Sequence, residues 1–182
     1  MTDPPDAVAA YVGAGSNIEP RENIPAALER LLRRVEVTGV STFYRTRPLA
    51  PPGDEGPVDQ DDFVNGVFRV RVACGARELK FGVLRAIEHE LGRRRSDDRY
   101  APRTIDLDVL LYGDEVIDEP DLKVPSDDIE RPFLAVGLLE LAPEMVLPHT
   151  RQCLSCLWGP GGVAGMTEDP EISRRLKEIW QP

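Results

Sequence analysis

One apolar strand in this chain carries two carboxylates. Residues 105–112 read Ile-Asp-Leu-Asp-Val-Leu-Leu-Tyr, which predicts a buried strand with charged side chains near its start. Because side chains alternate between the two faces of a strand, we expect Asp106 and Asp108 on one face and Leu107 and Val109 on the other. Two carboxylates on one face suit Mg²⁺, which takes one or two carboxylates and fills its other positions with water and phosphate oxygens. The alternative is an edge strand whose charges face water.

Arginines lie close to this dicarboxylate in the sequence. Arg103 precedes the pair, and the run Arg93-Arg94-Arg95 lies shortly upstream. Guanidinium groups and metal-bound carboxylates are the parts with which proteins neutralise and position a polyphosphate. Together these residues favour a site for a phosphate-bearing ligand over a solvated edge strand.

The length and net charge of the chain limit its number of domains and the kinds of ligand it can bind. With 182 residues it can bury an ordinary core, and we expect a single domain over residues 1–182. The net charge of −10 argues against nucleic acid as a partner, because binding a phosphate backbone needs a basic face. A small anionic substrate is compatible with this charge, since positive residues gather between Arg85 and Arg103.

The sequence also favours a cytoplasmic location. No apolar run is long enough to cross a membrane, and residues 1–7 are polar without a basic region, so we expect no secretory signal and no membrane partner. The three cysteines, Cys74, Cys153 and Cys156, are too few and too unevenly placed for a disulfide framework. A reducing, cytoplasmic setting follows, and no obligate protein partner is evident.

Hydrophobic periodicity and turn residues divide the chain into alternating strands and helices. Strands are expected at 7–14, 35–46, 63–72 and 105–112, and helices at 23–34, 77–91, 132–141 and 173–180. Asn23 is expected to cap the first helix, with Pro25 in its first turn. Ser173 is expected to cap the last helix, with Glu171 just outside it. Long loops are expected at 48–62 and 93–103.

The order of these elements predicts the fold class. Strand, helix, strand, strand, helix, strand is the order of the α+β ferredoxin-like sandwich. In that fold, helices pack over one face of a mainly antiparallel sheet. The two long loops would then be active-site loops, because loops on a rigid scaffold often carry function.

Several motifs follow one another in an order that resembles a known family. They are Gly15-Ser16-Asn17, Phe43-Tyr44-Arg45-Thr46, Phe63-Val64-Asn65, Ile87-Glu88, Leu91-Gly92-Arg93, Pro102-Arg103-Thr104-Ile105-Asp106-Leu107-Asp108, Arg131-Pro132-Phe133-Leu134 and residues 139–143. With these motifs, residues 8–148 resemble the 6-hydroxymethyl-7,8-dihydropterin pyrophosphokinase family of folate synthesis. The segment 102–108 is the most specific match. Residues 149–182 would be a C-terminal extension of the same domain.

The resemblance implies a reaction and its cofactors. Pyrophosphate would move from ATP, the co-substrate, to the hydroxymethyl oxygen of a dihydropterin, and AMP would leave. The attack falls on the β-phosphorus, so negative charge gathers on oxygens that two Mg²⁺ ions can bridge. Asp106 and Asp108 match the positions that would hold both ions. Arg93 and Arg103 match loop arginines that would neutralise phosphate oxygens, which completes the set of expected catalytic residues.

The resemblance also implies a pterin pocket. A pterin is a flat bicycle with an amide-like edge, so it needs aromatic faces and a fixed set of polar groups. The expected pterin-binding residues are Phe63, Phe133, Asn65, Thr46, Pro48 and Leu49. Phe63 and Phe133 match aromatics that would sandwich the pterin. Asn65 and Thr46 match side chains that would bind its polar edge, and Pro48 and Leu49 would add backbone hydrogen bonds. Core packing is the alternative for the phenylalanines, and a loop-capping role is the alternative for the asparagine.

A third group of residues is expected to bind the nucleotide. These residues are Arg85, Glu88, Arg93, Tyr100, Arg103 and Arg131. Arg85 and Glu88 lie three positions apart on one helical face, so a surface ion pair is an equal alternative. Tyr100 matches a loop position where an aromatic would cover the site, and an ordinary surface aromatic is its alternative.

The sequence departs from the family pattern at one position. Where the family shows Pro-His ahead of its arginine, this chain reads Pro125-Ser126-Asp127-Asp128, and Arg131 is retained. Unless Asp127 and Asp128 turn outward, they would repel a triphosphate. A catalytically weakened pterin-binding relative is therefore the alternative function. An acidic metal-binding interaction domain without a substrate is a third.

His149, Cys153 and Cys156 form a weak zinc-ligand pattern beyond the family match. A fourth ligand is not apparent, and free thiols in a C-terminal tail are the alternative. Residues 159–162 read Gly-Pro-Gly-Gly, which predicts a link, because the Lys-Ser/Thr of a phosphate-binding loop is missing.

Overall fold

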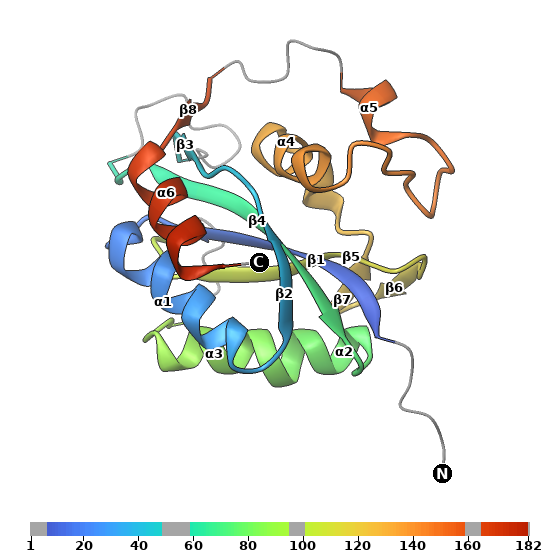
Figure 1. The fold of residues 1–182 in the computed structure, drawn as a ribbon, viewed down its shortest axis with the longest axis horizontal. Coiled ribbons are helices and arrows are strands. Elements are labelled where there is room, and N and C mark those ends of the chain that lie inside the picture. Colours follow the sequence, from blue (N-terminus) through green and yellow to red (C-terminus); the bar gives the residue numbers. More distant parts are fainter. Residues whose placement is uncertain (1–6, 49–58, 95–100, 159–164, 182) are drawn as a thin grey trace.

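The computed structural model describes residues 7–48, 59–94, 101–158 and 165–181 (Figure 1). The strands are β1 (Val8–Ser16), β2 (Glu36–Val40), β3 (Tyr44–Thr46), β4 (Phe63–Val72), β5 (Asp106–Tyr112), β6 (Ile117–Glu119), β7 (Leu122–Val124) and β8 (Thr167–Glu168). The helices are α1 (Pro20–Leu32), α2 (Ala76–Glu78), the π-helix η1 (Leu79–Leu84), α3 (Arg85–Glu90), the 3-10 helix η2 (Asp127–Glu130), α4 (Pro132–Leu141), α5 (Leu154–Leu157) and α6 (Pro170–Ile179). The segments α2, η1 and α3 follow one another without a break.

The main sheet is antiparallel at each described pairing. Strand β1 lies between β5 and β4, so that Val12 pairs with both Val109 and Phe68. Strands β2 and β3 both pair with β4, and β8 pairs with β3. This order makes β5 an edge strand. Strands β6 and β7 form a separate hairpin.

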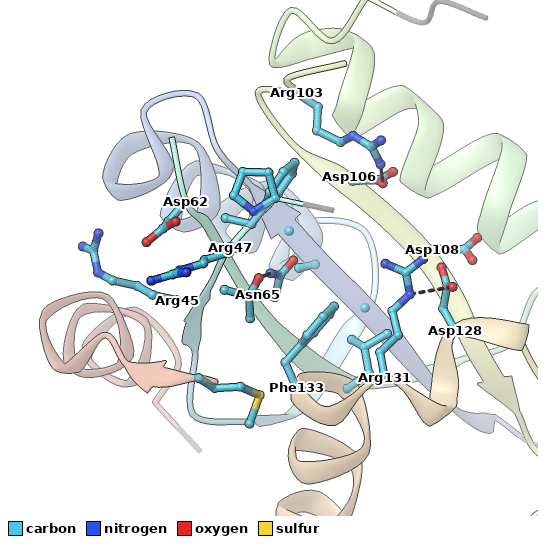
Figure 2. Close-up of a pocket in the computed structure, with 18 of the residues that line it drawn as sticks. Arg45, Arg47, Asp62, Asn65, Arg103, Asp106, Asp108, Asp128, Arg131 and Phe133 are labelled. Atoms are coloured by element: carbon cyan, nitrogen blue, oxygen red, sulfur yellow. Dashed lines mark hydrogen bonds and ion pairs between the residues drawn. The ribbon is translucent and has the colours of Figure 1, made fainter. Parts of the chain in front are cut away.

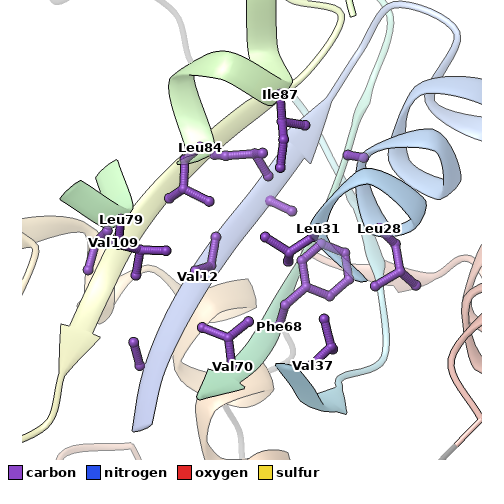
Figure 3. Close-up of a cluster of buried hydrophobic side chains, with 14 of the residues drawn as sticks. Val12, Leu28, Leu31, Val37, Phe68, Val70, Leu79, Leu84, Ile87 and Val109 are labelled. Carbon is purple, nitrogen blue, oxygen red and sulfur yellow. The ribbon is translucent and has the colours of Figure 1, made fainter. Parts of the chain in front are cut away.

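Helices cover both faces of the main sheet, so the prediction that they pack over one face is wrong. On one face, side chains of α1, η1, α3 and α6 join Val12, Phe68 and Val109 in the larger buried cluster (Figure 3). On the other face, α4 and α5 pack with Val67 and Leu110 in a smaller cluster. Full burial of one such apolar side chain contributes about 1.5–3 kcal/mol. The architecture is thus a mixed fold of helices and antiparallel sheet with a core on each face.

The predicted alternation of side chains is confirmed in the strand that carries the two carboxylates. Leu107 and Val109 belong to the larger cluster. Asp106 and Asp108 lie on the opposite face and line a cavity there, together with Leu110. The strand is therefore anchored by its apolar residues while its carboxylates stay accessible to ligands.

The predicted start of the first helix is wrong. Helix α1 begins at Pro20 with Glu19 at its N-cap, so Asn23 lies inside the helix. Asn23 instead donates from Nδ2 to the Ile18 carbonyl oxygen at 2.7 Å. Proline suits the first helical position, because its fixed φ matches the helix and its missing N–H would have no partner there.

The predicted cap of the last helix is also wrong. Helix α6 begins at Pro170, and the side chain of Asp169 accepts a hydrogen bond from the Ile172 N–H at 3.0 Å. Glu171 and Ser173 therefore lie inside the helix. The Ser173 hydroxyl accepts from the Phe43 N–H, which ties α6 to the segment before β3.

Two predicted strands have different bounds. Strand β1 continues through Ser16, two residues beyond its predicted end at residue 14. The strand expected at 35–46 is two strands, β2 and β3, because the segment between them leaves the ladder. There the Ser41 hydroxyl accepts from the Val67 N–H at 2.8 Å and replaces a backbone acceptor. The bounds predicted for β4 and α4 are confirmed.

Two further predictions concern the long loops and membrane-spanning helices. Much of each expected long loop, residues 49–58 and 95–100, lies outside the described residues. In the described part of the chain, no helix has the length and apolar character needed to span a membrane.

Candidate functional site

A cavity of about 1300 Å³ lies on the α4 face of the sheet (Figure 2). Residues of β1, β3, β4, β5, the start of α4 and the segment that leads into β8 line it. The predicted site residues in its wall are Thr46, Pro48, Phe63, Asn65, Arg93, Arg103, Asp106, Asp108, Arg131 and Phe133. Arg85 and Glu88 do not line the cavity, and Leu49 and Tyr100 lie outside the described residues.

Asp106 is held by two arginines. Arg93 Nη1 lies 2.7 Å from Asp106 Oδ1, and Arg103 Nη1 pairs with Oδ2. Arg93 also donates to the carbonyl oxygen of Ile105 at 2.7 Å. Burial by itself would raise the pKa of Asp106, but the two guanidinium charges hold that pKa below its usual value. Asp106 is therefore a carboxylate at neutral pH.

Asp108 has a separate cation, Lys80, which the sequence did not mark. Lys80 Nζ lies 2.9 Å from Asp108 Oδ1, and the Ser126 hydroxyl donates toward Oδ2 at 3.5 Å. Burial raises the pKa of Asp108, Lys80 opposes that rise, and the neighbouring charge of Asp106 adds to it. The residue that departs from the family pattern, Ser126, thus lies beside the dicarboxylate.

Glu88 is buried, with 2% of its surface exposed. Its Oε1 accepts a hydrogen bond from the Leu107 N–H at 2.9 Å and lies 3.5 Å from Arg93 Nη1. The alternative of a surface ion pair is therefore wrong. Glu88 fixes the backbone between the two aspartates and faces Arg93, which pairs with Asp106. Its direct contact with a nucleotide stays a prediction.

Arg85 lies on the same helix with its guanidinium over an aromatic ring. Its Cζ is 4.1 Å from the centre of the Phe81 ring. Its Nε is buried and has no hydrogen-bond partner among the described residues. Nucleotide binding by Arg85 also stays a prediction.

The Gly-Ser-Asn motif anchors the chain at Arg103. Asn17 Oδ1 accepts from the Arg103 N–H at 2.8 Å, and the N–H groups of Asn17 and Ile18 donate to the Arg103 carbonyl oxygen at 3.2 and 3.3 Å. These bonds fasten the residues before β5 to the end of β1. The motif was recognised in the sequence, but this contact was not predicted.

Asn65 and Thr46 lie together at another part of the wall. Asn65 Nδ2 donates to Thr46 Oγ1 at 2.8 Å, and 8% of Asn65 is exposed. A Cβ atom added to Gly15, which pairs with Asn65 across the sheet, would lie 2.3 Å from Asn65 Oδ1. Glycine at this position is therefore required by the close approach of the amide.

Two aromatic rings border the same region. Phe63 and Phe133 are partly buried and both line the cavity. The Arg103 guanidinium lies 5.8 Å from the centre of the Phe63 ring, and Phe133 also packs against the smaller core cluster. In Figure 2, Phe133 projects from α4 toward Asn65. Neither ring is confined to the core, so both can contact a ligand.

The acidic segment after Ser126 is divided between solvent and cavity. Asp127 is exposed, and Lys123 Nζ lies 2.8 Å from its Oδ1. Asp128 lines the cavity, where it accepts from Arg131 Nε at 2.7 Å. The requirement that both aspartates turn outward is thus met by one of them, and the charge of the other is paired with Arg131.

The cavity wall also contains residues that the sequence reasoning missed. They are Arg45, Arg47, Asp62, Asp128, Gly165, Met166 and Thr167, among others. Three of these belong to the C-terminal extension, where β8 pairs with β3. Asp169, which is 2% exposed, pairs with Arg45. No local pattern in the sequence could have placed the C-terminal segment beside β3.

The His149, Cys153 and Cys156 pattern does not form a metal site. Within the described residues, which include these three, no group of three or more His, Cys, Asp or Glu side chains is arranged to hold a metal ion. Cys153 and Cys156 are free thiols.

Known proteins are similar to this chain in sequence. Residues 11–143 match the model of a family described as 7,8-dihydro-6-hydroxymethylpterin-pyrophosphokinase. A 2-amino-4-hydroxy-6-hydroxymethyldihydropteridine pyrophosphokinase of Pseudomonas aeruginosa is 44% identical over 145 residues, or 78% of this chain and 85% of that protein. The protein of that name in Haemophilus influenzae is 38% identical over 79% of this chain and 88% of its own length.

The fold also resembles solved structures of more distant proteins. A Plasmodium falciparum HPPK-DHPS structure superposes with a TM-score of 0.65 at 14% identity, over 86% of this chain. This chain spans 44% of that protein. At this identity the comparison supports the fold alone.

Proposed function

Because this chain belongs to the 7,8-dihydro-6-hydroxymethylpterin-pyrophosphokinase family, we infer that its cavity holds ATP and a dihydropterin side by side. It is an ATP-dependent diphosphotransferase of folate synthesis. The reaction moves pyrophosphate from ATP to the hydroxymethyl oxygen of 6-hydroxymethyl-7,8-dihydropterin and releases AMP. The observation that carries the assignment of residues is the meeting of Asp106 and Asp108 with Arg93 and Arg103 in the wall of one cavity.

The dicarboxylate fits Mg²⁺ by the chemistry of its donors. Asp106 and Asp108 offer hard oxygen ligands on one strand face, and both line the cavity. These two residues would hold two ions, which when bound would neutralise the β- and γ-phosphate oxygens and lower the charge on the attacking hydroxyl. The partial burial of the carboxylates strengthens their interaction with any cation, because fewer water molecules compete.

The arginines beside Asp106 would bind the phosphates. Arg93 and Arg103 already bring their donors to the carboxylate, so a small rotation would turn them toward phosphate oxygens at the same place. Glu88 restricts Arg93 from behind, and Asn17 fixes the backbone of Arg103. This support would lower the cost of ordering the two side chains when ATP binds.

The pterin would lie at the other part of the wall. Phe63 and Phe133 would stack on its two faces, while Asn65 and Thr46 would bond its polar edge. Backbone groups of the expected residues Pro48 and Leu49 would complete that edge. Asn65 suits the role because its amide is fixed by a hydrogen bond yet remains at the cavity surface.

The remaining expected residues would complete the nucleotide site. Arg131 lines the cavity and would bind the triphosphate after exchanging its bond to Asp128. Arg85, Glu88 and Tyr100 would complete the nucleotide site, as the family pattern implies. We also propose that the order of the strands is that of the ferredoxin-like sandwich and that residues 1–182 form one domain. We further propose that the protein acts in the cytoplasm without another obligate partner.

The assignment is tested by measuring AMP formation from ATP and Mg²⁺ with and without the dihydropterin. AMP should form only when the dihydropterin is present, and replacement of Asp106 by alanine should abolish it. A second candidate, a catalytically weakened pterin-binding relative, is favoured by Ser126. That candidate predicts that the dihydropterin binds in calorimetry while AMP formation stays at the rate seen without protein.

A further inference from the structure

Lys80 contacts the dicarboxylate from the helix that packs on the opposite face of β5. Its Nζ lies 2.9 Å from Asp108 Oδ1, and its side chain is 18% exposed. Because β5 is the edge strand, a side chain from the helical face can reach a carboxylate on the other face around that edge. Lys80 is thus a partly buried cation directed at an expected metal ligand.

The helix that carries Lys80 is held firmly against β5. Its neighbour Leu79 and the following Leu84 are fully buried in the larger core cluster (Figure 3). The segment between them is the π-helix η1, whose wider turn changes the direction in which side chains leave the helix. Such turns occur frequently at functional sites. The backbone therefore fixes the origin of the Lys80 side chain.

The two carboxylates have different cationic partners. Arg93 and Arg103 pair with Asp106, whereas Lys80 pairs with Asp108. A cation bound at Asp108 Oδ1 would repel an ammonium group that is itself 2.9 Å from that oxygen. Lys80 then needs another anion within reach of its flexible side chain, and the triphosphate of the nucleotide is the anion that the reaction brings there.

We propose that Lys80 is a further nucleotide-binding residue, whose ammonium exchanges Asp108 for a phosphate oxygen of ATP. The inference rests on the proposed function. One charge-assisted hydrogen bond to phosphate corresponds to a change of about tenfold or more in affinity.

Calorimetric titration with an ATP analogue that has a methylene group between its α- and β-phosphorus atoms, in the presence of Mg²⁺, tests the proposal. Lys80→Met should weaken binding of the analogue by about tenfold and leave dihydropterin affinity within twofold of wild type. Lys80→Arg should retain most of the affinity, since it keeps the charge. Lys177→Met, at an exposed position of α6, is the matched control and should bind both ligands like wild type.

Analogue binding by Lys80→Met that equals wild type would overturn the proposal. If that protein also binds Mn²⁺ alone more tightly, Lys80 only competes with metal for Asp108. If Lys80→Met does not fold, Lys80→Gln, which can still bond Asp108, must show the same loss. Failure of the wild-type protein to bind the analogue with Mg²⁺ would instead contradict the proposed function.

Discussion

A methyl group at position 15 would take the space of the Asn65 amide. The Cβ of Gly15→Ala would lie 2.3 Å from Asn65 Oδ1, and in the described part of the chain the only other close atom is Asn65 Cγ, at 3.4 Å. The atom that must move is therefore at the end of a side chain, and the backbone can stay in place. We predict that Gly15→Ala rotates Asn65 out of position and weakens pterin binding while the fold survives.

The expected change in the free energy of unfolding is smaller than the expected change in pterin-binding free energy. Rotation of Asn65 breaks its 2.8 Å hydrogen bond to Thr46, which costs about 0.5–1.5 kcal/mol. Alanine offsets part of this cost by reducing the entropy of the unfolded chain, by about 0.4–1 kcal/mol. The net change in the free energy of unfolding should be about 1 kcal/mol or less, and Tm should fall by about 4 °C at most. Loss of the amide from the pterin edge should cost about 1–3 kcal/mol of binding, or about 5- to 150-fold in affinity.

Thermal unfolding and calorimetric titration with the dihydropterin measure both quantities. Asn65→Ala should reproduce the loss of affinity, and the double variant with Gly15→Ala should lose little more, because both changes act on one amide. Gly75→Ala is the matched control, since a Cβ there meets no atom within 4 Å. Pterin affinity within twofold of wild type in a folded Gly15→Ala protein would refute the reasoning.

Three further predictions concern the carboxylates. Asp106→Ala and Asp108→Ala should each remove most AMP formation in Mg²⁺ while unfolding stays cooperative, because a metal clamp supplies several kcal/mol to the transition state; wild-type turnover would refute the metal assignment. Glu88→Gln should lower the free energy of unfolding in urea by about 1–3 kcal/mol, because the neutral amide can still accept from the Leu107 N–H but lacks the charge that faces Arg93; an unchanged midpoint would contradict this. Asp169→Ala should lower the free energy of unfolding by about 2–4 kcal/mol, because it removes both the cap of α6 and the buried partner of Arg45. Glu171→Ala, at an exposed position, should lower it by under about 0.5 kcal/mol, and equal losses would contradict this account.

Local patterns predicted the elements that bury one face against a core. The alternation in β4 places Phe68 toward the larger cluster and Val67 toward the smaller, and its predicted bounds match the structure. The same rule correctly placed Asp106 and Asp108 on one face of β5. These predictions succeed because burial on one face leaves little freedom in how a strand can be oriented.

The helix starts were less well predicted, although the sequence held a usable signal. Both α1 and α6 begin with proline, Pro20 and Pro170, and the residue before each proline is the cap. Asn23 and Ser173 were favoured because their side chains are common caps, but common caps also occur inside helices. Proline at the first position was the more specific indication.

Contacts between distant residues could not be predicted from local pattern. Asp169 lies 124 residues from Arg45, and their pairing depends on β8 reaching β3. Lys80 reaches Asp108 only because β5 is at the sheet edge and a helix crosses behind it. Motif matches likewise identified residues of the cavity wall but not the bonds, such as Glu88 to the Leu107 backbone, that hold the wall in place.

The most direct test of the central claim follows the phosphorus atoms of ATP during one reaction. Phosphorus NMR of ATP, Mg²⁺, 6-hydroxymethyl-7,8-dihydropterin and the wild-type protein should show AMP and a pterin diphosphate appearing in equal amounts, with no ADP. The same mixture with Asp108→Ala should show unchanged ATP. Formation of ADP with a pterin monophosphate, or equal product formation by the Asp108→Ala protein, would contradict the account.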